Sequence, residues 1–162
     1  MCQFISFFHR PDNGDIGVYD VTSHGKTEEH LKLNKNLWRE GHWLPGGELI
    51  CRVLPEDKTT AEECADRMLN RFKKFEDFVE WVFDGKKEIT ASETDVTIDL
   101  RGCDLSKLKE LTLPKEIGGS LYLSGCDLSK LKSWPEKIGG YLYLRGCDLT
   151  GIEIPKKFNV IK

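Results

Sequence analysis

Long apolar runs are missing from this chain of 162 residues. A membrane-spanning helix needs about 18 consecutive apolar residues, and no segment here approaches that length. The first residues, MCQFISFFHRPDNGD, also lack the basic start of a secretion signal and soon reach His9, Arg10 and Asp12. We therefore expect no membrane partner and a cytoplasmic location.

An excess of basic charge is missing as well. Lysine and arginine together number 24 against 27 aspartates and glutamates, so the formal net charge is -3. General nucleic-acid-binding proteins gather a surplus of Lys and Arg on one side, because the phosphates that they bind must be neutralised. The charge balance argues against that class.

Paired ligands for zinc are also absent. No Cys-x-x-Cys occurs, and the four histidines show no paired ligand spacing. Six cysteines could form disulfides in a chain of this length, but without a secretion signal the reduced state is favoured. The sequence predicts neither a metal nor another cofactor.

Familiar catalytic motifs are missing too. The chain has no G-x-S-x-G, P-loop, H-E-x-x-H or paired-carboxylate pattern. Histidine can still do acid–base work, and His24 lies near Asp20 while His42 lies between Glu40 and Trp43. Structural, hydrogen-bonded histidines are the simpler interpretation. A small enzyme with its active site near His24 and His42 is the alternative.

What the chain does have is one phrase written three times in its last third. The copies are IDLRGCDLSKLK from Ile98, LYLSGCDLSKLK from Leu121 and LYLRGCDLTGIE from Leu142. Such a period is typical of structural units that stack on one another and display a regular binding face. The central cysteines, 23 and then 21 residues apart, are Cys103, Cys126 and Cys147.

Aligned on cysteine, each copy reads L-x-L-x-x-C-x-L. This pattern resembles the conserved segment of leucine-rich repeats, L-x-x-L-x-L-x-x-N/C-x-L, and in particular the short bacterial and phage-type repeats with a proline-containing connector, here PKEIGG and PEKIGG. The resemblance implies a short right-handed β-solenoid over the last part of the chain. The family's first leucine falls on Asp95, Gly118 and Gly139, so the Ile-Gly-Gly element must pack differently.

Alternation along each copy separates inward from outward side chains. The inward leucines should stack in layers, and each cysteine should be buried with its thiol bonded to backbone, as asparagine is in the commoner repeat. The outward side chains should line the strand-bearing side of the array. They are Thr97, Asp99, Arg101, Ser120, Tyr122, Ser124, Tyr141, Tyr143 and Arg145.

Tyrosine flanked by arginine is typical of protein-binding hot spots. Tyr122 and Tyr143 could also form an aromatic ladder across the strands, and the two roles can coexist. We predict a partner-binding face on these strands. Its residues are Asp99, Arg101, Tyr122, Tyr141, Tyr143 and Arg145.

Lysines recur along one edge of the predicted array. Lys107 and Lys109 align with Lys130 and Lys132, so stacking would place like charges in register unless solvent or an acidic partner screens them. A solvated edge is the simpler interpretation. The alternative is contact with an acidic partner, either a protein surface or a nucleic-acid backbone. The net charge argues against the nucleic acid. We include the four lysines among the candidate partner-binding residues.

The N-terminal half predicts strands and helices of a small α+β unit. Strands are expected over residues 3–10 and 16–21, joined by a hairpin at Asn13-Gly14, and over 48–54. The segment LWREGHW, which precedes the last of these strands, is interpreted either as a ligand-binding loop or as a packing plug.

Three helices are expected in the same half. Ser23 or Thr27 caps a short one, and Thr60 to Glu63 form a capping box for the next. The third carries an apolar stripe at helical spacing. Its members are Phe75, Phe78, Val79, Val82 and Phe83.

These patterns predict an α+β protein with a head domain over residues 1–88 and a leucine-rich-repeat-like array of about three repeats over 89–162. The favoured function is non-enzymatic binding of a protein partner through the outward face. The combination is similar to small proteins carried by bacteria and their phages, which motivates the hypothesis of an inhibitor of a host factor. Since the last strand needs cover from residues 155–162 or from another chain, monomer and weak homodimer both stay open.

Overall fold

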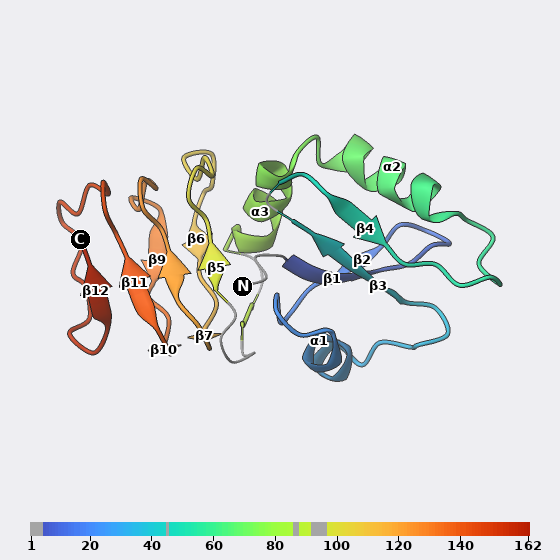
Figure 1. Ribbon diagram of the computed structural model, residues 1–162, viewed down its shortest axis with the longest axis horizontal. Helices are drawn as coiled ribbons and strands as arrows, with labels where there is room; N and C mark the ends of the chain where they lie inside the picture. The colour runs from blue at the N-terminus through green and yellow to red at the C-terminus, as the bar shows by residue number, and fades with distance from the viewer. Residues whose placement is uncertain (1–4, 45, 86–87, 92–96) are drawn as a thin grey trace. The chain divides into compact units, whose positions relative to one another are not determined.

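The computed structural model describes residues 5–44, 46–85, 88–91 and 97–162 (Figure 1). They form three helices and several sheets, so the predicted α+β class is confirmed. The chain makes two compact units: the first, here called the head, ends at Phe78, and the second, here called the array, is Val79–Lys162. The division falls inside α3 (Phe75–Phe83), earlier than the boundary expected at residue 88.

The head contains an antiparallel sheet in the order β2-β1-β3-β4. β1 (Ile5–His9) and β2 (Ile16–Gly17) form the hairpin predicted around Asn13-Gly14. Every residue of β1 is buried, because α1 and α2 cover opposite faces of the sheet (Figure 1).

The segment LWREGHW is not the loop that its composition suggested. Most of it is β3 (Arg39–Trp43), which pairs with β1 on one side and with β4 (Leu49–Cys51) on the other. Alternate residues of β3 are buried, and Trp43 is fully buried. The segment is therefore a strand rather than a loop over Arg39–Trp43, and the packing interpretation is confirmed for Trp43.

Two helices of the head begin at the predicted caps. α1 (His24–Leu31) starts after Ser23, whose hydroxyl accepts a hydrogen bond from the Lys26 backbone N–H. α2 (Ala61–Arg71) starts after Thr60, which exchanges two hydrogen bonds with Glu63 in a complete capping box. No described helix combines the length and apolar content that crossing a membrane requires.

Aromatic rings from the sheet and the helices meet in the head core. Trp43 stacks on Phe78 with ring centroids 5.2 Å apart, and Phe7 and Phe72 approach the same ring edge-on at 5.5 and 5.1 Å. The stripe predicted for α3 is confirmed, since all five of its members are buried.

The array is built from three ladders of short parallel strands. Each copy of the repeat contributes one strand to the largest ladder, whose order is β12-β11-β8-β5. Its strands are β5 (Ile98–Asp99), β8 (Leu121–Tyr122), β11 (Tyr141–Tyr143) and β12 (Asn159–Ile161). The two smaller ladders pair β6 (Leu111–Thr112) with β9 (Leu131–Ser133), and β7 (Glu116–Ile117) with β10 (Lys137–Ile138).

Register in the largest ladder brings equivalent leucines side by side. Ile98 lies opposite Leu121, which lies opposite Leu142. The predicted inward positions are nearly all buried, so the layered core of leucines is confirmed. The buried members are Ile98, Leu100, Leu105, Leu121, Leu123, Leu128, Leu142 and Leu144.

The Ile-Gly-Gly element packs backbone against backbone. The Gly139 N–H donates to the Ile117 carbonyl at 2.8 Å, and a Cβ at Gly139 would clash with the carbonyl oxygen of Gly118. Glycine therefore stands where the commoner repeat has leucine because neighbouring copies approach too closely for a side chain. The first equivalent position, Asp95, lies outside the described residues.

The end of the chain covers the last strand of the repeats, which is the first of the two alternatives left open for this strand. β12 pairs with β11, with Tyr141 opposite Asn159. Lys157 Nζ donates to the Glu136 carbonyl at 2.6 Å, so side-chain contacts fasten this segment to the preceding copy. β12 is thus an additional strand after the three copies.

Candidate interaction surface

The strand register gathers the predicted binding residues into one surface. Asp99, Tyr122 and Tyr143 lie in one row across β5, β8 and β11, because each is directly opposite the next. This row lies beside the buried row of leucines, as alternation requires. We call the surface the tyrosine face. It comprises Asp99, Arg101, Tyr122, Tyr141, Tyr143 and Arg145.

Tyr122 and Tyr143 form the centre of the tyrosine face. Their rings are stacked almost parallel, with centroids 4.1 Å apart and an interplanar angle of 4°. A hydrogen bond with the Tyr122 side chain raises the pKa of Tyr143 above its ordinary value. The predicted aromatic ladder is confirmed, and recognition of a partner by the same rings stays a prediction.

Arg101 extends this stack by one further planar group. Its guanidinium lies over the Tyr122 ring at 4.6 Å from the centroid, a cation–π arrangement. The same guanidinium donates to both carboxylate oxygens of Asp99, with Nε distances of 2.9 and 3.0 Å. Asp99 therefore orients Arg101, and Arg101 orients the stack.

The remaining members differ in how far they reach solvent. Tyr141 is 50% exposed, and its ring lies 6.1 Å from that of Tyr143. Arg145 is exposed. Thr97, expected on the outward side, is only 2% exposed and so adds nothing to the surface.

The lysine edge departs from the register that the aligned copies suggested. Leu111 pairs with Leu131, so Lys109 does not lie across from Lys132. Lys132 instead lies 3.7 Å from the Glu110 carboxylate. The first connector is longer than the second, which shifts the stacked segments and replaces a repulsive pair by an attractive one. Lys107, Lys109 and Lys130 are exposed, as expected for a solvated edge.

The repeated cysteines follow the prediction of buried backbone donors in part: Cys126 is buried, whereas Cys103 and Cys147 are half-buried. Cys126 Sγ donates to the Leu100 carbonyl at 3.2 Å, and Cys147 Sγ donates to the Leu123 carbonyl at 3.1 Å, so each thiol bonds the preceding copy. Burial raises the pKa of Cys126 to about 12, which keeps it a thiol. None of the described cysteines forms a disulfide.

In the head, the structure brings together the two histidines of the enzymatic alternative. The rings of His24 and His42 meet edge to face with centroids 4.6 Å apart. His24 Nε2 lies 3.1 and 3.0 Å from the carbonyls of Phe7 and Gly41, which is a structural role in fastening α1 to the sheet. Burial, helped by the proximity of His24, lowers the pKa of His42 below its ordinary value.

Two structurally important polar groups in the chain escaped the sequence patterns. Arg39 donates to both oxygens of Asp57, at 2.9 and 2.8 Å, and neither side chain is more than 10% exposed. Trp134 Nε1 donates to the Glu153 carbonyl at 2.9 Å, tying the second copy to the third. For the Trp134 contact, the sequence offered one local indication, which is a tryptophan at a position where the first copy has none.

Within the described ranges, no three His, Cys, Asp or Glu side chains group together as metal ligands. Comparison of the chain with protein-family models, with curated proteins and with solved structures finds no significant match.

Proposed function

We propose that the chain is a protein-interaction module that binds a protein partner through the tyrosine face. The observation that carries this proposal is the continuous stack of Arg101, Tyr122 and Tyr143, fastened at one end by Asp99. Tyr and Arg are enriched among the residues that dominate binding energy, because each combines a large contact area with a polar end.

The stack is already ordered before a partner binds, which favours its use in binding. Binding normally costs conformational entropy as exposed side chains become ordered. Here Asp99 already orients Arg101, and the stacking contact already restricts Tyr122 and Tyr143. Binding of a partner would therefore cost little further conformational entropy in these groups. Tyr141 and Arg145 supply more exposed contacts beside them.

The architecture that we propose for the array is a leucine-rich-repeat-like β-solenoid. Parallel pairing in three separate ladders and layers of equivalent leucines support it. A solenoid suits recognition because its outward side chains can vary without changing the core. We further propose that the protein acts in the cytoplasm, where its free thiols would stay reduced, and that binding blocks a host factor, as expected of a phage or mobile-element protein.

The proposal is tested by changing Tyr122, Tyr143 and Arg145 to alanine together and comparing capture of partners from an extract of the host organism. Tyr19→Ala is a matched control, because Tyr19 is also a stacked tyrosine but lies in the head against His30. Hot-spot tyrosines contribute about 2 kcal/mol or more, so affinity for a true partner should fall about thirtyfold or more in the triple variant only.

Thermal unfolding must show that the triple variant is folded. Equal recovery of every partner by the triple variant and the wild type would exclude the tyrosine face. If the triple variant keeps the biological activity while His42→Ala loses it, the head is the active part and the enzymatic alternative gains.

A further inference from the structure

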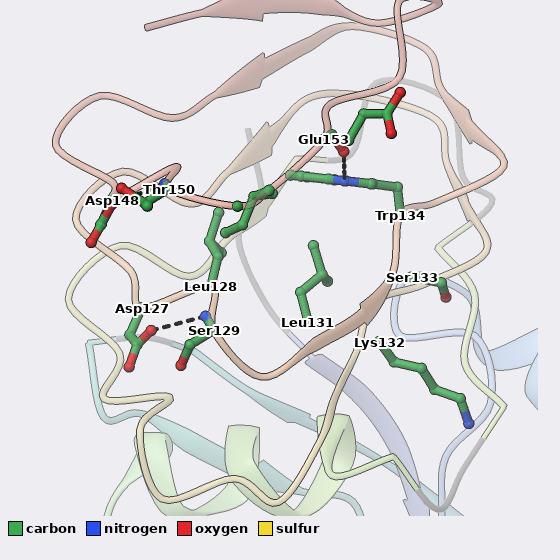
Figure 2. A pocket seen from close by; sticks show the side chains of 12 residues that line it. Asp127, Leu128, Ser129, Leu131, Lys132, Ser133, Trp134, Asp148, Thr150 and Glu153 are labelled. Carbon is green, nitrogen blue, oxygen red and sulfur yellow. Dashed lines mark hydrogen bonds between the residues drawn. The ribbon is translucent and has the colours of Figure 1, made fainter.

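A groove of about 510 Å³ opens between the second and third copies of the repeat (Figure 2). Figure 2 shows Leu128 and Leu131 near its centre, Trp134 toward one end, and Asp127 with Asp148 at the opposite end. The volume lies in the range of sites that enclose a small ligand or a few residues of a peptide, about 300–1,000 Å³.

The groove lies where the third copy, whose residues are all described, forms no strand beside β9. Between the first and second copies, the connectors are joined by the pairing of β6 with β9, in which Leu111 lies opposite Leu131. In the third copy, Pro155 follows Cys147 by eight residues, against nine between Cys126 and Pro135 in the second copy and eleven between Cys103 and Pro114 in the first. Residues 151–153, across the groove from β9, form no strand in the described part of the chain.

Trp134 makes one end of the groove rigid. Its indole Nε1 donates to the Glu153 carbonyl at 2.9 Å, so the ring spans the gap between the two copies. The Phe158 ring supports it edge-on, with centroids 6.4 Å apart. A fixed aromatic wall beside leucine side chains favours an apolar group of a ligand.

The opposite end of the groove is acidic. Asp127 Oδ1 accepts from the Ser129 N–H at 2.9 Å, and Asp148 Oδ1 accepts from the Thr150 N–H at 3.0 Å. Hydrogen bonds from these neighbours lower the pKa of both carboxyl groups, so both are ionised at neutral pH while they stay exposed.

The basic group at the groove does not offset this charge. Figure 2 shows the Lys132 side chain directed away from Trp134 and from the two aspartates. Its ammonium lies 3.7 Å from the Glu110 carboxylate instead. A ligand that fits the groove should therefore be apolar in the middle and positively charged toward Asp127 and Asp148.

We propose that this groove is a second binding site, which takes an extended peptide segment of a partner with an apolar side chain near a lysine or arginine. β9 has β6 as its partner on one side, and an extended peptide beside its other edge would continue the ladder as a further strand. The apolar side chain contacts Leu128, Leu131 and Trp134, and the cation contacts Asp127 and Asp148. This site is separate from the tyrosine face and does not depend on it.

The test is selection from a library of random seven-residue peptides displayed on phage against the full chain. Peptides with an apolar residue within two positions of Lys or Arg should be enriched. Asp127→Asn and Asp148→Asn, made together, remove both charges while asparagine still accepts the Ser129 and Thr150 hydrogen bonds. Since exposed ion pairs contribute modestly, we expect about two- to tenfold weaker binding of the best peptide.

Asp104→Asn is the matched control, because Asp104 makes the same turn with Ser106 in the first copy but does not line the groove. It should leave binding of the best peptide unchanged. NMR provides the location: the indole N–H signal of Trp134, assigned by its loss in Trp134→Phe, should shift on adding the peptide.

Three results would overturn the proposal. One is the absence of any enriched class of peptide, and another is binding that leaves the Trp134 signal in place or is insensitive to the double asparagine variant. The third is a shift of the Trp134 signal with protein concentration alone, which would assign the groove to a second copy of the chain.

Discussion

The head and the array bury apolar side chains in different ways. In the head, Phe7, Trp43, Phe72 and Phe78 converge from separate elements, and Phe78 touches the other three rings. In the array, most of the buried side chains are leucines, and those of the repeats lie opposite their equivalents in neighbouring copies. The head concentrates stability in a few large groups, whereas the array distributes it over many similar ones.

Polar groups follow the same division. The head buries one bidentate ion pair, Arg39 with Asp57, and Arg39 also donates to three backbone carbonyls. In the array, the thiols of Cys126 and Cys147 donate to carbonyls of the preceding copy. Its ion pairs, such as Lys132 with Glu110, lie at the surface. The array can therefore change its surface chemistry without changing its core, which suits a binding module.

The comparison is tested most strongly by removing one large side chain from each unit. Phe78→Ala should lower the free energy of unfolding by about 3–5 kcal/mol, since it leaves a cavity among three aromatic rings. Leu123→Ala should cost about 2–3 kcal/mol, because neighbouring layers can partly close over the smaller gap. Urea denaturation followed by circular dichroism measures both. A larger loss for Leu123→Ala would contradict the proposed concentration of stability in the head.

The next largest effect should be a loss of stability in acid, which concerns the Arg39–Asp57 pair of the head. Hydrogen bonds from Arg39 lower the pKa of Asp57 in the folded state. The stability that the pair contributes is therefore present above the ordinary pKa of about 3.9 and is lost as pH falls through that value toward the lowered one. Asp57→Asn should cost about 3 kcal/mol at pH 7 by leaving Arg39 without its charge partner, and should remove most of this acid dependence. Urea denaturation of the wild type and of Asp57→Asn between pH 2 and pH 7 measures this dependence. The same pH profile in both proteins would contradict the prediction.

Local patterns in the sequence predicted the elements whose information is local. The hairpin at Asn13-Gly14, the capping box at Thr60 and the stripe of α3 all formed as expected. β3 was not among the strands expected from the sequence, and it contains a glycine, Gly41. The structure explains that glycine: a Cβ at Gly41 would clash with the Phe7 ring, so a tertiary contact selects a residue that is unfavourable in strands.

The candidate surface was predictable to the extent that the repeat is regular. Alternation along the copies placed Tyr122 and Tyr143 on one side, and the ladder stacks them. The lysine register failed because the first connector is longer, which brings Lys132 to Glu110. The groove and the Trp134 hydrogen bond arise where the third copy departs from the pattern, so a consensus of the three copies could not reveal them.

A single methyl group should sharpen the comparison within the array. Gly139→Ala places a Cβ against the Gly118 carbonyl oxygen of the neighbouring copy, and we expect it to cost about 2 kcal/mol through overpacking. Gly25→Ala is the control in the head, where a Cβ would meet nothing within 4 Å and helix propensity favours alanine. Thermal unfolding should show a lower midpoint for Gly139→Ala alone. Equal midpoints would mean that the copies can move apart at little cost.

The smallest expected effect concerns the thiols that link copies. Cys126→Ala leaves the buried Leu100 carbonyl without its side-chain donor and should cost about 1 kcal/mol. Cys126→Ser keeps a donor of similar size and should cost less than Cys126→Ala. In the head, the Cys51 thiol faces the Met68 sulfur at 3.9 Å rather than a carbonyl, so serine there should be no better than alanine. Urea denaturation of the four variants gives the test, and a preference for serine at both sites would show that the donor does not distinguish the array from the head.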